Sequence, residues 1–197
     1  MKKTLIITAI TTFIIAIVVC VLIALYYLSV ISGAFLMFNY FAPNPPKPEI
    51  KYCEFPFSLT YEVDGEIKTI EDTLICEFDG FEMSNSGSKY RKWNSSFKSG
   101  REEIILLDLS DKNEINEFGH KMLNLFFYWG TPEYYMGDKS HYKCRSANED
   151  FKMIDFRYET VDGIIGGSAY SADVVYKKYK VKLIGWEIKK PIENNFD

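Results

Sequence analysis

A histidine and a cysteine three residues apart are the first groups in this sequence that could do chemistry. His141 and Cys144 have the spacing that puts two side chains on one helix face, where they could ligate a metal ion or act as base and nucleophile. The other histidine is His120, and no further ligands occur at zinc spacing. We therefore expect ordinary surface or turn residues here, and predict no metal site, no cofactor and no catalytic residue.

Carboxylates gather in one short stretch, at Glu71, Asp72, Glu77 and Asp79. Strand alternation would place Glu77 and Asp79 on one face, as a general acid and base pair requires. A solvated strand face is the simpler interpretation. The sequence also lacks a phosphate loop, a dinucleotide fingerprint, GxSxG and HExxH, so we favour a protein that is not an enzyme.

A basic and aromatic segment gives the strongest indication of binding. Its Ser and Gly content favours a loop, and its cations can pair with anionic groups while its rings supply contact area. The predicted binding residues are Lys89, Tyr90, Arg91, Lys92, Trp93 and Arg101. The partner would be anionic or a protein: lipid headgroups, wall polymers or an acidic protein surface. The alternative is a hairpin whose basic face is only solvated.

Charge and composition limit the class of partner. Setting Lys2 and Lys3 aside leaves 21 basic against 27 acidic residues, a net charge of −6, which disfavours nucleic acid. Hydrophobic residues make up 47% and aromatic residues 16%, which is enough for a folded core. The four cysteines have irregular spacing without a CxxC motif. One disulfide is compatible with a domain outside the cell, although a domain of this size does not need one.

An apolar segment opens the chain. Residues 4–42 contain no charge, and about 20 apolar residues suffice to cross a membrane. We predict a signal anchor over residues 1–42 with one span, about residues 4–28, and we leave the role of residues 29–42 open. A signal peptide cut near Ser32-Gly33-Ala34 and a pair of short spans are the alternatives. Lys2 and Lys3 favour an N-terminus inside and a domain outside.

A proline-rich linker, residues 43–50, should separate this anchor from a strand-rich domain, residues 51–197. Alternation over Phe55–Val63 predicts a half-buried strand, and Asp64-Gly65 predicts a hairpin turn. In the return strand, Ile67 and Ile70 are an odd number of residues apart and would lie on opposite faces. This predicts a bulge or break near Glu71-Asp72-Thr73.

The remaining pattern predicts an α+β fold that is mostly antiparallel, with one or two short helices. Residues 111–129 are ambiguous, and we favour a strand over Met122–Trp129 against a helix. The other expected elements are a strand over Ile104–Leu109, a helical turn over Thr131–Gly137, a strand around Ile154–Tyr158, a hairpin turn at Asp162-Gly163, a helix over Ala172–Tyr179, and a closing strand over Val181–Ile188 with a bulge at Gly185.

Six short segments of the domain form a recognisable set: Glu54–Phe57, Tyr61–Glu66, Glu71–Thr73, Cys76–Phe81, Tyr134–Asp138 and Trp186–Ile192. Together they resemble an uncharacterised bacterial family of small, N-terminally membrane-anchored proteins. The resemblance implies a bacterial envelope setting and brings no assigned activity with it.

The sequence thus predicts a single-pass module of the cell membrane that faces the exterior. Its apolar helix would contact membrane lipid, and its domain would bind a partner or assist one. The alternatives are an envelope enzyme without a recognisable motif and an immunity-type protein that neutralises a toxin at the membrane.

Overall fold

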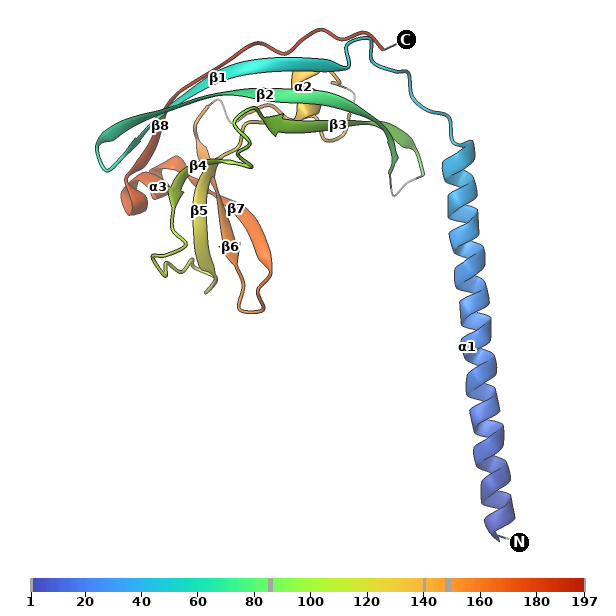
Figure 1. Cartoon of the computed structure of the whole chain (residues 1–197). Coiled ribbons are helices and arrows are strands. Elements are labelled where there is room, and N and C mark those ends of the chain that lie inside the picture. Colours follow the sequence, from blue (N-terminus) through green and yellow to red (C-terminus); the bar gives the residue numbers. More distant parts are fainter. Residues whose placement is uncertain (1, 85–86, 140, 148–149, 197) are drawn as a thin grey trace. The chain divides into compact units, whose positions relative to one another are not determined.

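The computed structural model describes residues 2–84, 87–139, 141–147 and 150–196. Contacts divide the chain into two compact units, Met1–Pro45 with Phe81–Tyr90, and Pro46–Gly80 with Arg91–Asp197. The elements, shown in Figure 1, are α1 (Lys2–Phe41), β1 (Tyr52–Val63), β2 (Glu66–Met83), β3 (Lys89–Phe97), β4 (Ile104–Asp108), β5 (Lys121–Phe127), α2 (Pro132–Tyr135), β6 (Met153–Glu159), β7 (Ile165–Ser171), α3 (Ala172–Tyr179) and β8 (Val181–Ile188).

Helix α1 contains the apolar segment. Its stretch Phe13–Ile31 has a mean hydropathy of 3.0, and every side chain in that stretch is exposed. By length and composition this helix can cross a membrane, and a signal sequence has the same character. The helix does not stop near Leu28 but continues to Phe41, so residues 29–41 extend it.

Strands β3, β2, β1 and β8 form the first of two antiparallel sheets, in that order. The predicted hairpin is present, with positive φ at Asp64 and Gly65. The predicted break in the return strand is wrong, because β1 and β2 pair without a register shift from Val63↔Glu66 to Tyr52↔Glu77. Ile67 simply lies on the outer face, 70% exposed, so its parity needs no bulge.

Alternation along β1 fills the core from this sheet. The residues that face inward, all buried, are Phe55, Phe57, Leu59, Tyr61 and Val63, as the sequence pattern predicts. The bulge predicted in β8 is confirmed, since Thr60 pairs with Gly185 and Tyr61 pairs with Leu183, which leaves Ile184 as the extra residue.

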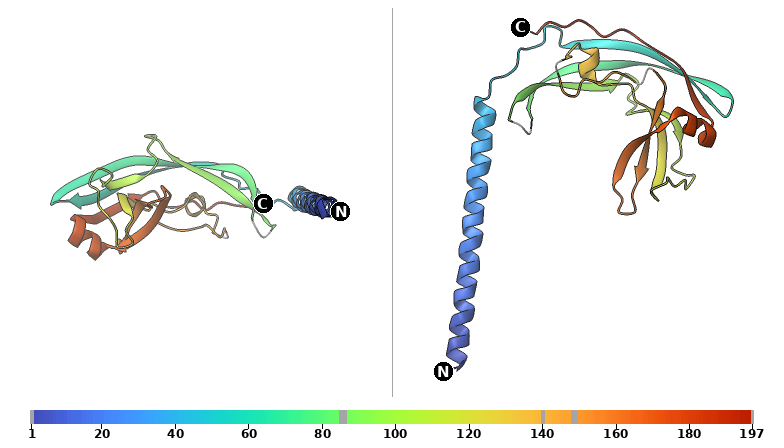
Figure 2. Two further views of the ribbon diagram at one scale, coloured as in Figure 1. Left: turned by 90° about the horizontal axis from the view of Figure 1, so that it is seen from below. Right: turned by 180° about the vertical axis from the view of Figure 1, so that it is seen from behind.

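Strands β4, β5, β6 and β7 form the second sheet (Figure 2). The ambiguous segment is the strand β5, and a turn containing Asp162-Gly163 joins β6 to β7. Side chains of both sheets share one core: the ring of Trp186 lies 5.0 Å from that of Phe57 and 4.8 Å from that of Phe127.

Two short helices complete the domain. α2 has Pro132 at its first position and ends before Gly137, whose φ is +73°. α3 has the predicted bounds and buries Val175 and Tyr179 against β6, β7 and β8. The α+β prediction is confirmed.

Candidate functional site

The basic and aromatic segment is not a loop. Most of it is β3, at one edge of the first sheet. Strand alternation turns Arg91 and Trp93 into the interior, where they are 8% and 6% exposed, while Lys92 faces outward. The sequence indicates this burial, because Arg91, Trp93 and Phe97 are spaced by even numbers of residues and therefore share one face of the strand.

Arg91 is tied to a carboxylate that is fully buried. Its Nε and Nη2 donate to the two oxygens of Asp138 at 2.7 and 2.6 Å, and Trp93 Nε1 donates to the same carboxylate at 3.1 Å. Burial alone would raise the pKa of Asp138, but these donors and the guanidinium charge hold it below its ordinary value. Arg91 also lies over the ring of Phe196 and donates to the Pro46 carbonyl.

Two further cations of the predicted site have carboxylate partners. Lys92 donates to Asp79 on the outer face, and Arg101 Nε donates to Asp72 at 2.8 Å. Lys89 and Tyr90 are half-buried in β3. A binding role for the six residues stays a prediction, and these ion pairs weaken it, because an anionic partner would have to displace protein carboxylates.

His141 and Cys144 follow α2 and are not on a helix. His141 is buried, its Nδ1 accepts a hydrogen bond from the Lys143 N–H, and burial lowers its pKa. Burial raises the pKa of the Cys144 thiol, which disfavours the thiolate that a nucleophile needs. Among the described residues, no group of three or more His, Cys, Asp or Glu side chains could hold a metal ion.

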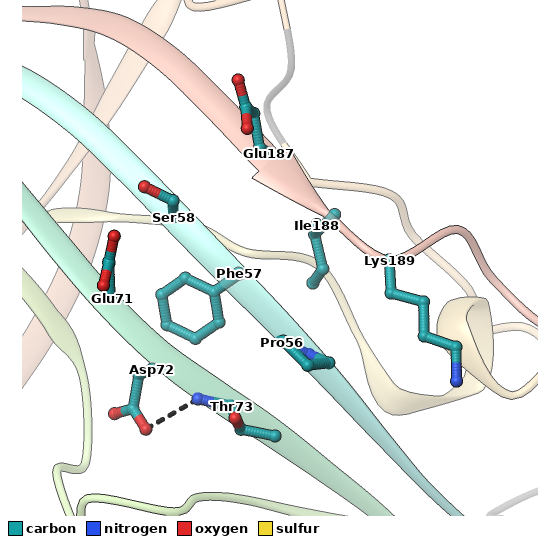
Figure 3. Close-up of a pocket in the computed structure, with 9 residues that line it drawn as sticks. All are labelled: Pro56, Phe57, Ser58, Glu71, Asp72, Thr73, Glu187, Ile188 and Lys189. Atoms are coloured by element: carbon teal, nitrogen blue, oxygen red, sulfur yellow. Dashed lines mark hydrogen bonds between the residues drawn. The ribbon is translucent and has the colours of Figure 1, made fainter.

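The carboxylate-rich strand borders a shallow depression of about 690 Å³ (Figure 3). Ser58 pairs with Glu71 on one side and with Glu187 on the other, so the three side chains form a row across the outer face. Both glutamates are exposed to solvent. Asp72 points to the opposite face, where Ser99 and Arg101 donate to it. Glu71 and Glu187 thus occupy a solvated strand face.

A cavity of about 960 Å³ lies between α2 and the segment that follows β8. Half-buried rings of Tyr134, Phe151 and Trp186 line it, and lysines and glutamates share its rim. Trp186 packs on Phe57 and Phe127, and Tyr134 packs on Tyr135, so these rings also build the core.

Large apolar side chains are exposed at one end of the second sheet. They come from the loop before β5 and from the β6–β7 hairpin, which reach the same end of the sheet in both Figure 1 and Figure 2. We call this surface the apolar tip: Ile115 (58% exposed), Phe118 (69%), Val161 (91%), Ile164 (64%) and Ile165 (52%). Ile115 and Val161 line one depression of about 570 Å³, which joins the two loops.

Hydrogen bonds hold the loop before β5 in this conformation. The buried side chain of Asn116 accepts from the backbone N–H groups of Phe118 and His120 at 3.0 and 2.9 Å. Gly119 supplies the positive φ that the turn requires, and Ile115 forms a β-bridge with Lys121. The loop therefore presents Ile115 and Phe118 to solvent by its own structure.

The hairpin between β6 and β7 is held in the same way. The Thr160 hydroxyl accepts from the N–H of Ile164 at 3.1 Å, and the Thr160 carbonyl accepts from the N–H of Gly163 at 2.9 Å. The hairpin thus holds Val161 and Ile164 outward, and both loops of the tip are preformed.

Carboxylates predominate around the apolar tip. Lys121 faces Glu159 across β5 and β6, and Glu114 pairs with Lys178 at 3.4 Å. The other charged residues of the two loops, all exposed, are Asp111, Lys112, Glu117 and Asp162. The rim of the tip is therefore acidic.

Sequence reasoning missed the apolar tip because Ile115 and Phe118 fit a helical stripe. The available signal was their position beside Asn116 and Gly119, which favour turns.

No family model, no curated protein and no solved structure matches this chain.

Proposed function

We propose that this chain is a single-pass, membrane-anchored binding module of the bacterial envelope that docks a protein partner through the apolar tip. The observation that carries the proposal is the exposure of five large apolar side chains on two loops that hydrogen bonds hold in place. Contiguous apolar patches of more than a few hundred Å² are rare on monomeric proteins and commonly mark interaction sites.

The acidic rim supports a protein with a basic surface as the partner. Asp111, Glu117 and Asp162 would repel an anionic lipid surface and would also repel the same rim on a second copy. A partner with an apolar pocket among Lys or Arg side chains would match both parts of the surface.

The length of the N-terminal apolar run supports a retained anchor. The apolar core of a signal peptide spans roughly 7–15 residues, whereas Phe13–Ile31 alone exceeds this. The mature protein should keep its N-terminal residues, so a mass that places the N-terminus near Ala34 would identify a cleaved signal peptide instead.

Photo-crosslinking in the native membrane tests the docking proposal. A benzophenone amino acid replaces Phe118 in the full-length chain, and the control replaces Tyr142, which is 67% exposed but outside the apolar tip. We expect a discrete adduct from position 118 and none from position 142. The substitution Val161→Ser, added to the chain that carries the benzophenone at position 118, should remove the adduct. Equal adducts from both positions, or none from position 118, would refute docking at the tip.

A charge reversal tests the chemistry of the partner. Glu117→Lys with Asp162→Lys should lower the adduct yield from position 118 at least several-fold, because the basic partner would then meet like charges. A higher yield would assign an acidic partner, and an unchanged yield would exclude electrostatic complementarity. If the adduct contains a toxin, the immunity-type alternative is favoured.

A further inference from the structure

Two of the four cysteines lie directly opposite each other in the first sheet. Cys53 of β1 pairs with Cys76 of β2 in the antiparallel register, next to the pair formed by Phe55 and Leu74. Residues two apart in a strand share a face, so both thiols lie on the side of the sheet that carries Phe55 and Leu74. Both cysteines are free thiols in this structure.

The Cα spacing between the strands is compatible with a covalent link. The two-residue turn makes Val63↔Glu66 a hydrogen-bonded pair, and alternation from there makes Cys53↔Cys76 one as well. The Phe78 N–H donates to the Lys51 carbonyl at 2.8 Å, as this alternation requires. The Cα atoms of such pairs are about 5.5 Å apart, within the range of about 4.4–6.8 Å that disulfides span. Their Cβ atoms, about 5–5.5 Å apart, must approach to about 3.5–4.5 Å for the bond to form.

The two thiols differ in access. Cys53 is half-buried, and its Sγ lies 3.7 Å from the Lys189 ammonium. Cys76 is fully buried, and burial raises its pKa to about 12. A reagent in solution therefore reaches Cys53 first. Cys76 lies opposite it and resolves the intermediate, in a slow step because its thiol must first lose its proton.

We propose that Cys53 and Cys76 form a disulfide between β1 and β2 when the domain meets a disulfide oxidant, such as oxidised glutathione or a thiol–disulfide oxidoreductase. The Cys53 thiolate attacks the oxidant's disulfide, which forms a mixed disulfide and releases one thiol. The Cys76 thiolate then attacks Cys53 Sγ and releases the second thiol. Two electrons pass to the oxidant, which is reduced to two thiols, and protons lost by the two cysteines balance those that the thiols take up.

Counting thiols on the full-length chain in detergent micelles tests this inference. After treatment with oxidised glutathione, the unfolded chain should show two fewer thiols that react with a maleimide, and digestion should yield one peptide pair that joins Cys53 to Cys76. The control Cys144→Ser should lose the same two thiols, whereas Cys53→Ser should form no intramolecular bond. A chain that keeps all four thiols, or a link through Cys20 or Cys144, would refute the inference.

Thermal unfolding gives a second measurement. A bond between Cys53 and Cys76 closes the hairpin loop in the unfolded chain, which should raise the Tm by about 6–10 °C relative to the reduced protein. Cys53→Ser should show no shift with oxidant. A linked protein whose Tm does not rise would show that the bond distorts the sheet and does not belong to the native fold.

Discussion

Asp138 accepts a hydrogen bond on each carboxylate oxygen from Arg91, 47 residues away in the sequence, and neither side chain is more than 10% exposed. A buried carboxylate and guanidinium stabilise a fold only while both are present. Arg91→Ser should therefore lower the free energy of unfolding by about 3–5 kcal/mol, because it leaves the Asp138 charge buried without its main partner. Urea unfolding of the detergent-solubilised full chain measures this loss.

The matched control is Lys92→Ser, the neighbouring residue in β3. Lys92 pairs with Asp79, but side-chain exposures of 42% and 43% leave that pair in contact with water, so its loss should destabilise the fold much less than the loss of Arg91. Equal losses in the two variants would mean that the Arg91–Asp138 pair contributes no more than a surface pair.

The same contrast shows what the sequence could and could not predict about the site. Local composition identified the basic segment, and its Ser and Gly residues favoured a loop. The even spacing of Arg91 and Trp93 indicates that both face inward, but the acceptor for Arg91 lies after α2, so nothing in residues 89–101 identifies the carboxylate that neutralises it. A quadruple replacement of Lys89, Arg91, Lys92 and Arg101, harmless for a solvated loop, should instead destabilise the domain through Arg91.

His141 should make the folded state less stable as the pH falls below about 6.5. Burial lowers the pKa of His141 from its ordinary value of 6.5, and the charges of Lys143 and Arg91 lower it further. The charges of Glu133 and Asp138 raise the pKa, but they do not offset the effect of burial. Below pH 6.5 the unfolded chain binds a proton that the folded chain does not, so stability falls as the pH falls towards the lowered pKa. Above pH 6.5 this contribution is fully present.

Unfolding measured at pH 7.5, 6.0 and 5.0 checks this dependence, with His141→Asn as the variant whose amide oxygen can still accept from the Lys143 N–H. The variant should lose less stability between pH 7.5 and 5.0 than the natural chain. Asp72 and Asp138 affect stability in a separate pH range. Because folding lowers their pKa values, the stability that they contribute is lost only as the pH falls below about 3.8. Identical pH profiles for the two proteins would contradict the role of His141.

Gly137 fixes the approach of the C-terminal segment to α2. A Cβ at Gly137 would lie 2.5 Å from the Ile192 carbonyl oxygen and 3.0 Å from the Asn194 nitrogen, and the φ of +73° already disfavours side chains. Asn194 in turn bonds both backbone groups of Ile50. Gly137→Ala should displace this segment as well as strain the backbone.

Gly100 provides the control, since its φ is +80° but an added Cβ would meet nothing within 4 Å. Gly100→Ala should cost about 1–2 kcal/mol from the left-handed backbone alone. Gly137→Ala should cost more and should also speed proteolysis of the C-terminal segment, read by mass spectrometry after brief protease treatment. Equal costs and unchanged proteolysis would show that the close approach to Ile192 does not constrain the fold.

Most elements of the fold could be predicted because the alternation over Phe55–Val63 and the turns at Asp64-Gly65 and Asp162-Gly163 are local signals. The failure in β2 has a physical cause. The predicted bulge assumed that every isoleucine in the strand is buried, whereas Ile67 lies on the solvated face of a long hairpin. The apolar tip was missed for the related reason that exposure depends on tertiary packing, which neighbours in sequence do not specify.

Orientation in the membrane can be tested on intact cells. The positive-inside rule predicts that Lys2 and Lys3 stay in the cytoplasm, which places the domain from Pro48 onward outside. Protease added to intact cells or spheroplasts should therefore degrade the domain, while a cytoplasmic marker protein stays intact. Lys2→Glu with Lys3→Glu removes the charge bias and should raise the protected fraction, since the Lys47 and Lys51 side would then be the more basic flank.

Protection of the natural chain until the membrane is lysed would place the domain inside. The proposed partner would then be cytoplasmic, and a stable Cys53–Cys76 disulfide would not be expected in the reducing cytosol.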